Sequence, residues 1–88
     1  METAREEATI DLLGVLAYGE LQAFERLSMD AVLSPDLAGR EAVTEMAIGE
    51  YGHYKILVEG LRARGADPMS AMRPFVAPIE NFHKSTAP

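Results

Sequence analysis

The sequence predicts an all-α protein whose main feature is an antiparallel pair of long helices. Two long stretches place apolar residues at three- and four-residue steps, which is the repeat of one helix face. Only a few residues separate the two stretches, and so short a link makes neighbouring helices antiparallel. No stretch alternates apolar and polar residues in the way of a half-buried strand.

The first helix is expected over about residues 4–31, which contain no proline. Its apolar face is formed by Ile10, Leu13, Ala17, Leu21, Phe24 and Leu27. Residues 1–30 carry seven acidic and two basic side chains. We interpret this excess of acidic residues as a solvated face of the helix.

The second helix is expected over about residues 35–64. Ser34 is a good N-cap, Pro35 suits the first helical position, and Asp36 lies at the positive end of the helix dipole. Gly65 is placed to end the helix, because glycine adopts the left-handed conformation that follows many helices. The apolar face comprises Val43, Met46, Ala47, Tyr54, Leu57 and Leu61.

The remainder of the chain is expected to contain little helix. A short helical turn is predicted at about residues 68–73, and residues 74–88 are predicted to form an irregular tail. The reason is that proline has no amide donor and interrupts helical hydrogen bonding. Three prolines occur in the tail, namely Pro74, Pro78 and Pro88.

Composition excludes several classes of protein. A chain of 88 residues forms one domain, and the absence of cysteine excludes a disulfide scaffold, a Cys-ligated zinc finger and a thiol nucleophile. The formal net charge of -6 argues against a general nucleic-acid-binding surface. A hydrophobic fraction of 48% is too high for a disordered acidic tail. Residues 1–10 lack the pattern of a signal peptide and no apolar stretch is long enough to span a membrane, so a cytoplasmic location without a membrane partner is expected.

Three polar residues interrupt the apolar faces of the two long helices. Glu20 falls between Ala17 and Phe24 in the first face, and Glu50 and His53 fall within the second face, three residues apart. Measured from the turn, the positions of Glu20 and Glu50 differ in height by only about 6 Å, since an α-helix rises about 1.5 Å per residue. The three side chains are therefore expected to converge between the helices.

Two carboxylates between packed helices need compensation, because burying a charge costs several kcal/mol per ion. The nearest bases, Arg26 and Lys55, lie off the apolar faces. A divalent cation would supply the missing charge, and carboxylate oxygens with an imidazole nitrogen suit iron or manganese, with zinc as an alternative. The second interpretation is a solvated or salt-bridged polar seam without metal.

Other polar residues give weaker signals. Tyr54 follows Glu50 by one helical turn and is a candidate for a hydrogen-bonding partner of the ligands. Glu80 precedes His83 by three residues, but this pair lies among prolines and is interpreted as part of an exposed connector. The sequence assigns no catalytic residue.

A glutamate on one helix followed by Glu-x-x-His on the next resembles half of a ferritin-like di-iron site. The segments Leu13–Phe24 and Gly49–Tyr54 resemble the first helix pair of the bacterial family similar to tRNA 2-methylthio-N6-isopentenyladenosine hydroxylase. Residues Arg73–His83 resemble the connector that follows that pair. The resemblance covers nearly the whole chain.

This resemblance implies that Glu20, Glu50 and His53 are iron ligands and that Glu80 and His83 are not. Members of such families continue into a second helix pair, so the chain resembles an N-terminal half. Two copies would supply four carboxylates and two neutral imidazoles, whose formal charge two divalent ions would balance. A homodimer would thus complete a four-helix, two-metal site. Encapsulated ferritin-like proteins are similar two-helix chains completed by dimerisation.

Three functions follow as hypotheses. The first is oxygen activation at a di-iron centre, as in the tRNA hydroxylases, which would make tRNA a substrate by resemblance alone. The second is ferroxidase or iron-handling activity of the encapsulated-ferritin kind. The third is a metal-free helical interaction module.

Overall fold

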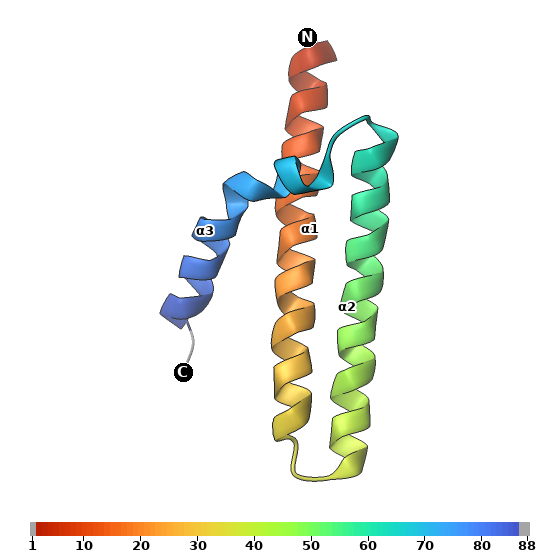
Figure 1. Ribbon diagram of the computed structural model, residues 1–88, viewed down its shortest axis with the longest axis vertical. Helices are drawn as coiled ribbons and strands as arrows, with labels where there is room; N and C mark the ends of the chain where they lie inside the picture. The colour runs from red at the N-terminus through yellow and green to blue at the C-terminus, as the bar shows by residue number, and fades with distance from the viewer. Residues whose placement is uncertain (1, 87–88) are drawn as a thin grey trace.

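The computed structural model describes residues 2–86, and every regular element in that range is helical. Helix α1 spans Glu2–Leu33, α2 spans Leu37–Ala63 and α3 spans Pro68–Thr86. Figure 1 shows α1 and α2 side by side and antiparallel, with α3 crossing α1 near its N-terminal half. The all-α class and the helical hairpin are confirmed. Within residues 2–86 no helix is both long and apolar enough to cross a membrane.

The turn between α1 and α2 differs from the sequence prediction by two residues. Asp36, not Ser34, caps α2, because the Asp36 carboxylate accepts a hydrogen bond of 2.7 Å from the backbone amide of Gly39. Ser34 instead donates its backbone amide to the carbonyl of Ala31, at 3.2 Å, and so closes the last turn of α1. Pro35 therefore lies in the turn and not at the first helical position of α2.

Gly65 ends α2 as predicted. Its φ of 74° is the only positive value among the described residues. The Gly65 amide donates to the carbonyl of Arg62 at 2.9 Å, and the Ala66 amide donates to the carbonyl of Leu61 at 3.0 Å. These two hydrogen bonds satisfy carbonyls that would otherwise have no helical partner, and they reverse the chain toward α3.

The prediction of an irregular tail is wrong over residues 74–86, which belong to α3. Asp67 caps this helix by accepting hydrogen bonds of 2.9 Å from the amide and the hydroxyl of Ser70. Pro74 and Pro78 lie four residues apart on the exposed side, where water can hydrogen-bond the carbonyls that lose their partners. In Figure 1, α3 first crosses α1 and then bends, as expected of a helix that contains proline. Residues 87–88 of the predicted tail lie outside the described residues.

Burial against α1 explains why α3 persists through its prolines. Met72, Val76 and Ile79 recur at helical spacing and pack against a core that includes Ala17 and Tyr18. Each proline costs a helix about 3 kcal/mol, and complete burial of a large apolar side chain returns about 1.5–3 kcal/mol. Met72 is buried and Val76 and Ile79 are partly buried, so their contacts offset part of the cost of the two prolines.

α3 covers one side of the hairpin and leaves the other side bare. The core cluster, with Ala17, Tyr18, Val58 and Met72 at its centre, lies on the side of α3. On the other side Leu12, Leu16 and Ile56 are about half or more exposed, at 57%, 46% and 70%. The Cα radius of gyration is 15.2 Å, whereas about 12 Å is typical of a compact domain of this length. We call the surface that α3 does not cover the bare face.

Candidate metal centre

Glu20, Glu50 and His53 come together between α1 and α2, as predicted. Each offers one ligand atom, and these atoms all lie within 4.8 Å of one another. The register of the antiparallel hairpin sets this arrangement, because the short turn brings the middle of α1 to the same height as the middle of α2. This is the one group of three or more potential metal ligands found within residues 2–86.

The cluster is half open. The side chain of Glu20 is 27% exposed, and that of His53 is 63% exposed. His53 therefore lies at the solvent-exposed edge of the cluster, while Glu20 lies deeper between the helices. The sequence predicted that all three point where the core should be, but periodicity alone did not reveal that His53 is mostly solvated in a single copy of the chain.

One carboxylate oxygen of Glu20 lacks a partner. The Oε2 atom is buried and accepts no hydrogen bond. The nearest base is His53, whose Nδ1 lies 3.7 Å away, which is too long for a hydrogen bond. A buried acceptor without a donor is costly, since it gives up its hydration and receives nothing in return. A cation placed between the three donors would satisfy it.

The electrostatics of Glu20 also favour a cation between the three side chains. The pKa of Glu20 is raised above its usual range, first because protonated Glu20 can hydrogen-bond to Glu50, and then because of burial and repulsion by the Glu50 charge. His53 opposes this shift. Two carboxylates that share one site favour the protonated form of one of them, and a cation between them would relieve the same repulsion.

Within the described residues, Tyr54 makes no direct contact with the cluster that would show the predicted role. It forms no hydrogen bond with Glu20, Glu50 or His53 there; its ring stacks on Tyr51 with centroids 5.6 Å apart and packs against the core. Its predicted role beside a metal ligand stays a prediction.

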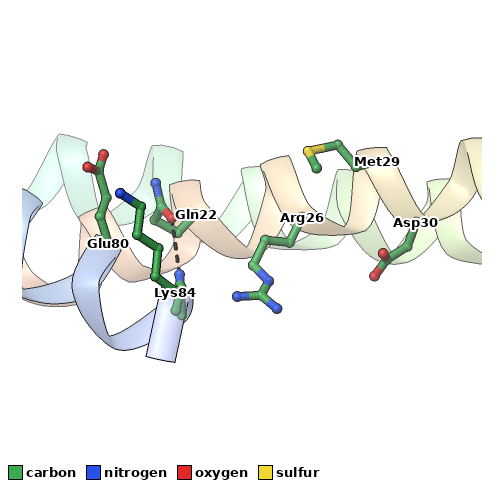
Figure 2. A pocket seen from close by; sticks show the side chains of 7 residues that line it. Gln22, Arg26, Met29, Asp30, Glu80 and Lys84 are labelled. Carbon is green, nitrogen blue, oxygen red and sulfur yellow. Dashed lines mark hydrogen bonds between the residues drawn. The ribbon is translucent and has the colours of Figure 1, made fainter. Parts of the chain in front are cut away.

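The sequence analysis missed a polar network that fastens α3 to α1. The Tyr18 hydroxyl donates a hydrogen bond of 2.8 Å to Glu80 and accepts one of 3.0 Å from the Gln22 side-chain amide. His83 Nδ1 lies 3.1 Å from the Gln22 side-chain oxygen, an interaction drawn as a dashed line in Figure 2. Glu80 and His83 are therefore not a free connector. Helical spacing of Met72, Val76 and Ile79 would have been the signal that this segment packs against a partner helix.

This network makes Tyr18 difficult to ionise. Burial, the hydrogen bond to Glu80 and the Glu80 charge raise its pKa to about 12. The folded pKa exceeds the unfolded value of about 10, so neutral Tyr18 stabilises the fold below that value. This stabilisation is lost as the pH rises toward the folded pKa. We expect a phenolate absorbance step near pH 12 that disappears in Tyr18→Phe. An unchanged step in the variant would contradict the assignment.

Beside this network, α1 and α3 form a shallow cleft of about 440 Å³. Figure 2 shows Arg26 and Asp30 projecting from α1, with Glu80 and Lys84 on α3. Arg26 and Lys84 are positively charged, whereas Asp30 and Glu80 are negatively charged. The cleft therefore favours neither anionic nor cationic ligands.

A family model described as a ferritin-like domain of actinomycetes matches residues 3–88. A comparison with curated proteins finds no match. The family match agrees with the ferritin-like part of the resemblance, and nothing in it refers to a tRNA hydroxylase.

Proposed function

Because the chain belongs to the ferritin-like domain family of actinomycetes, we propose that Glu20, Glu50 and His53 bind iron. The observation that carries the proposal is the placement of three donor atoms within 4.8 Å around the partnerless Oε2 of Glu20. Two carboxylates and a neutral imidazole form a donor set that suits ferrous iron or manganese, with zinc as an alternative. One divalent ion balances the two carboxylate charges.

We further propose that two copies of the chain complete a di-iron centre. Within residues 2–86 a single copy offers three candidate ligand residues and leaves His53 63% exposed. Ferritin-like centres use a glutamate from each of two helices and Glu-x-x-His from each of the other two. Two hairpins joined through their bare faces would provide that set.

Glycines around the cluster support this pairing. A Cβ atom added at Gly19, Gly49 or Gly52 would meet nothing within 4 Å. Each glycine costs a helix about 1 kcal/mol relative to alanine, and no contact within one copy explains that cost. Close approach of a partner's helices would explain it, because glycine lets backbones pack closely.

The chemistry proposed for the bound metal is oxidation of ferrous iron by oxygen, for which iron supplies the electrons. In this proposal the carboxylates of Glu20 and Glu50 balance the charge of the metal ion. His53 binds the ion at the exposed edge of the site, which the second copy covers. Hydroxylation of tRNA is disfavoured, because a chain with a net charge of -6 repels a phosphate backbone.

Anaerobic titration with ferrous iron tests both proposals. We expect about two ions per dimer, together with a doubling of the mass in solution measured by light scattering. Addition of oxygen should then produce ferric iron without an organic substrate. A monomer that binds no metal would contradict the proposal and would favour a metal-free interaction module.

Metal binding should weaken as the solution becomes more acidic. Ligands must lose their protons before they bind a metal, and the pKa of Glu20 is raised. The proton therefore begins to compete at a pH above the ordinary range for glutamate, which is about 4.3. Isothermal calorimetry over a pH series should show falling affinity and proton release on binding. Affinity independent of pH would exclude Glu20 as a ligand.

A further inference from the structure

We propose that a cleft lined by all three helices binds a small organic carboxylate with an apolar body. The cleft has a volume of about 280 Å³. Its lining includes Tyr18 and Leu21 from α1, Tyr54 from α2, and Met72, Arg73 and Val76 from α3. It opens beside the core on the side that α3 covers and is separate from the bare face.

Most of the lining is apolar. The Tyr18 hydroxyl is engaged by Glu80 at 2.8 Å, so the part of Tyr18 left to a ligand is its ring. Leu21 and Val76 add aliphatic surface, and Met72 adds a flexible side chain that adapts to ligand shape. Such a surface favours an apolar ligand body by removing it from water.

Two polar groups on the lining have no partner that would compete with a ligand. Arg73 is exposed and forms no ion pair within residues 2–86. Asp67 senses the charge of Arg73, but its carboxylate already accepts two hydrogen bonds from Ser70. The Tyr54 hydroxyl likewise makes no hydrogen bond within the same residues. A guanidinium and a phenol together offer donors to a carboxylate.

Size and charge together define the ligand. Small-molecule sites commonly measure about 300–1,000 Å³, so a cleft of about 280 Å³ fits a small molecule and not an extended one. The chain as a whole is acidic, and Arg73, which forms no ion pair within residues 2–86, is the one charged residue on the lining of this cleft. The complementary ligand is a monocarboxylate of medium chain length.

The test is a titration of the metal-free full chain with octanoate, octanol and acetate, followed by amide NMR shifts. We expect saturable binding of octanoate with shifts around Tyr54, Met72 and Val76. Octanol lacks the charge and acetate lacks the apolar body, so both should bind more weakly. Because the protein is metal-free, failure of this proposal is distinguishable from failure of the iron site.

Variants separate the charge from the cleft itself. Arg73→Gln should weaken octanoate binding about tenfold, as expected for a hydrogen bond to a charged group, and should leave octanol binding unchanged. Arg62→Gln is the matched control, because Arg62 pairs with Glu59 and lies outside the cleft. Val76→Phe should fill the cleft and block both ligands while the protein stays helical by circular dichroism.

Three results of the ligand titrations would overturn the proposal, and a fourth result would come from the protein without ligand. They are absence of saturable octanoate binding, equal affinity for octanoate and octanol, and shifts centred on Glu20 and His53. A second copy of the chain seated on the cleft would also overturn it, and would be recognised by shifts at Met72 and Val76 that depend on protein concentration without any ligand.

Discussion

Glu20→Gln should reduce affinity for ferrous iron by more than about 100-fold, since loss of even an outer-shell partner commonly costs 10–100-fold. The metal-free variant should nevertheless be at least as stable as the parent protein at neutral pH. Glutamine has the same shape and carries no charge, so it removes the partnerless Oε2 carboxylate and its repulsion by Glu50. Metal analysis and urea unfolding measure the two effects separately.

The sign of the stability change follows from the raised pKa of Glu20. The folded protein holds the proton more tightly than the unfolded chain, so stability falls as the pH rises through the unfolded and then the folded pKa. Glu20→Gln abolishes this decline. Glu59→Gln is the control, because Glu59 is 75% exposed and pairs only with Arg62. Loss of stability in Glu20→Gln with iron binding intact would refute the assignment of Glu20.

Gly14→Ala should destabilise the protein by about 1–3 kcal/mol, the usual cost of overpacking. A methyl group at Gly14 would overlap the carbonyl oxygen of Ala71 and lie 2.9 Å from its carbonyl carbon. Both groups belong to backbone, which cannot move aside without lifting α3 from α1. Thermal unfolding followed by circular dichroism measures the loss of stability.

Gly19→Ala supplies the matched control, because nothing lies within 4 Å of a Cβ added there. On the metal-free single chain this change should raise stability by about 1 kcal/mol, the helix propensity difference. Equal effects of the two substitutions would show that α3 does not cross α1 at Gly14. If Gly19→Ala also prevents the mass doubling with iron, the methyl group obstructs the partner.

The hairpin was predictable from sequence because its cause is local. Apolar spacing defines both helix faces, and the conformational freedom of Gly65 marks the end of α2. The convergence of Glu20 with Glu50 and His53 followed from helical rise and a short turn. The cap of α2 was harder, since Ser34 and Asp36 are both good cap residues and only the turn geometry chooses between them.

The course of α3 was not predictable from local rules. Pro74 and Pro78 argue against a helix, and they are overridden by tertiary contacts with α1 such as the packing of Met72 and Val76. The hydrogen bond from Tyr18 to Glu80 joins residues 62 positions apart, so no sequence window contains it. The exposure of His53 depends on which face α3 covers, and that is a tertiary property.

α3 covers one side of the hairpin and leaves the other exposed, and this asymmetry constrains how two copies could pair. In the proposed pair the uncovered sides of two molecules would meet, because α3 occupies the other side of each hairpin. Such contact is isologous, and the same patch serves both molecules. In the proposed pair the third helix would therefore favour an assembly that closes at two copies over one that continues as a fibre.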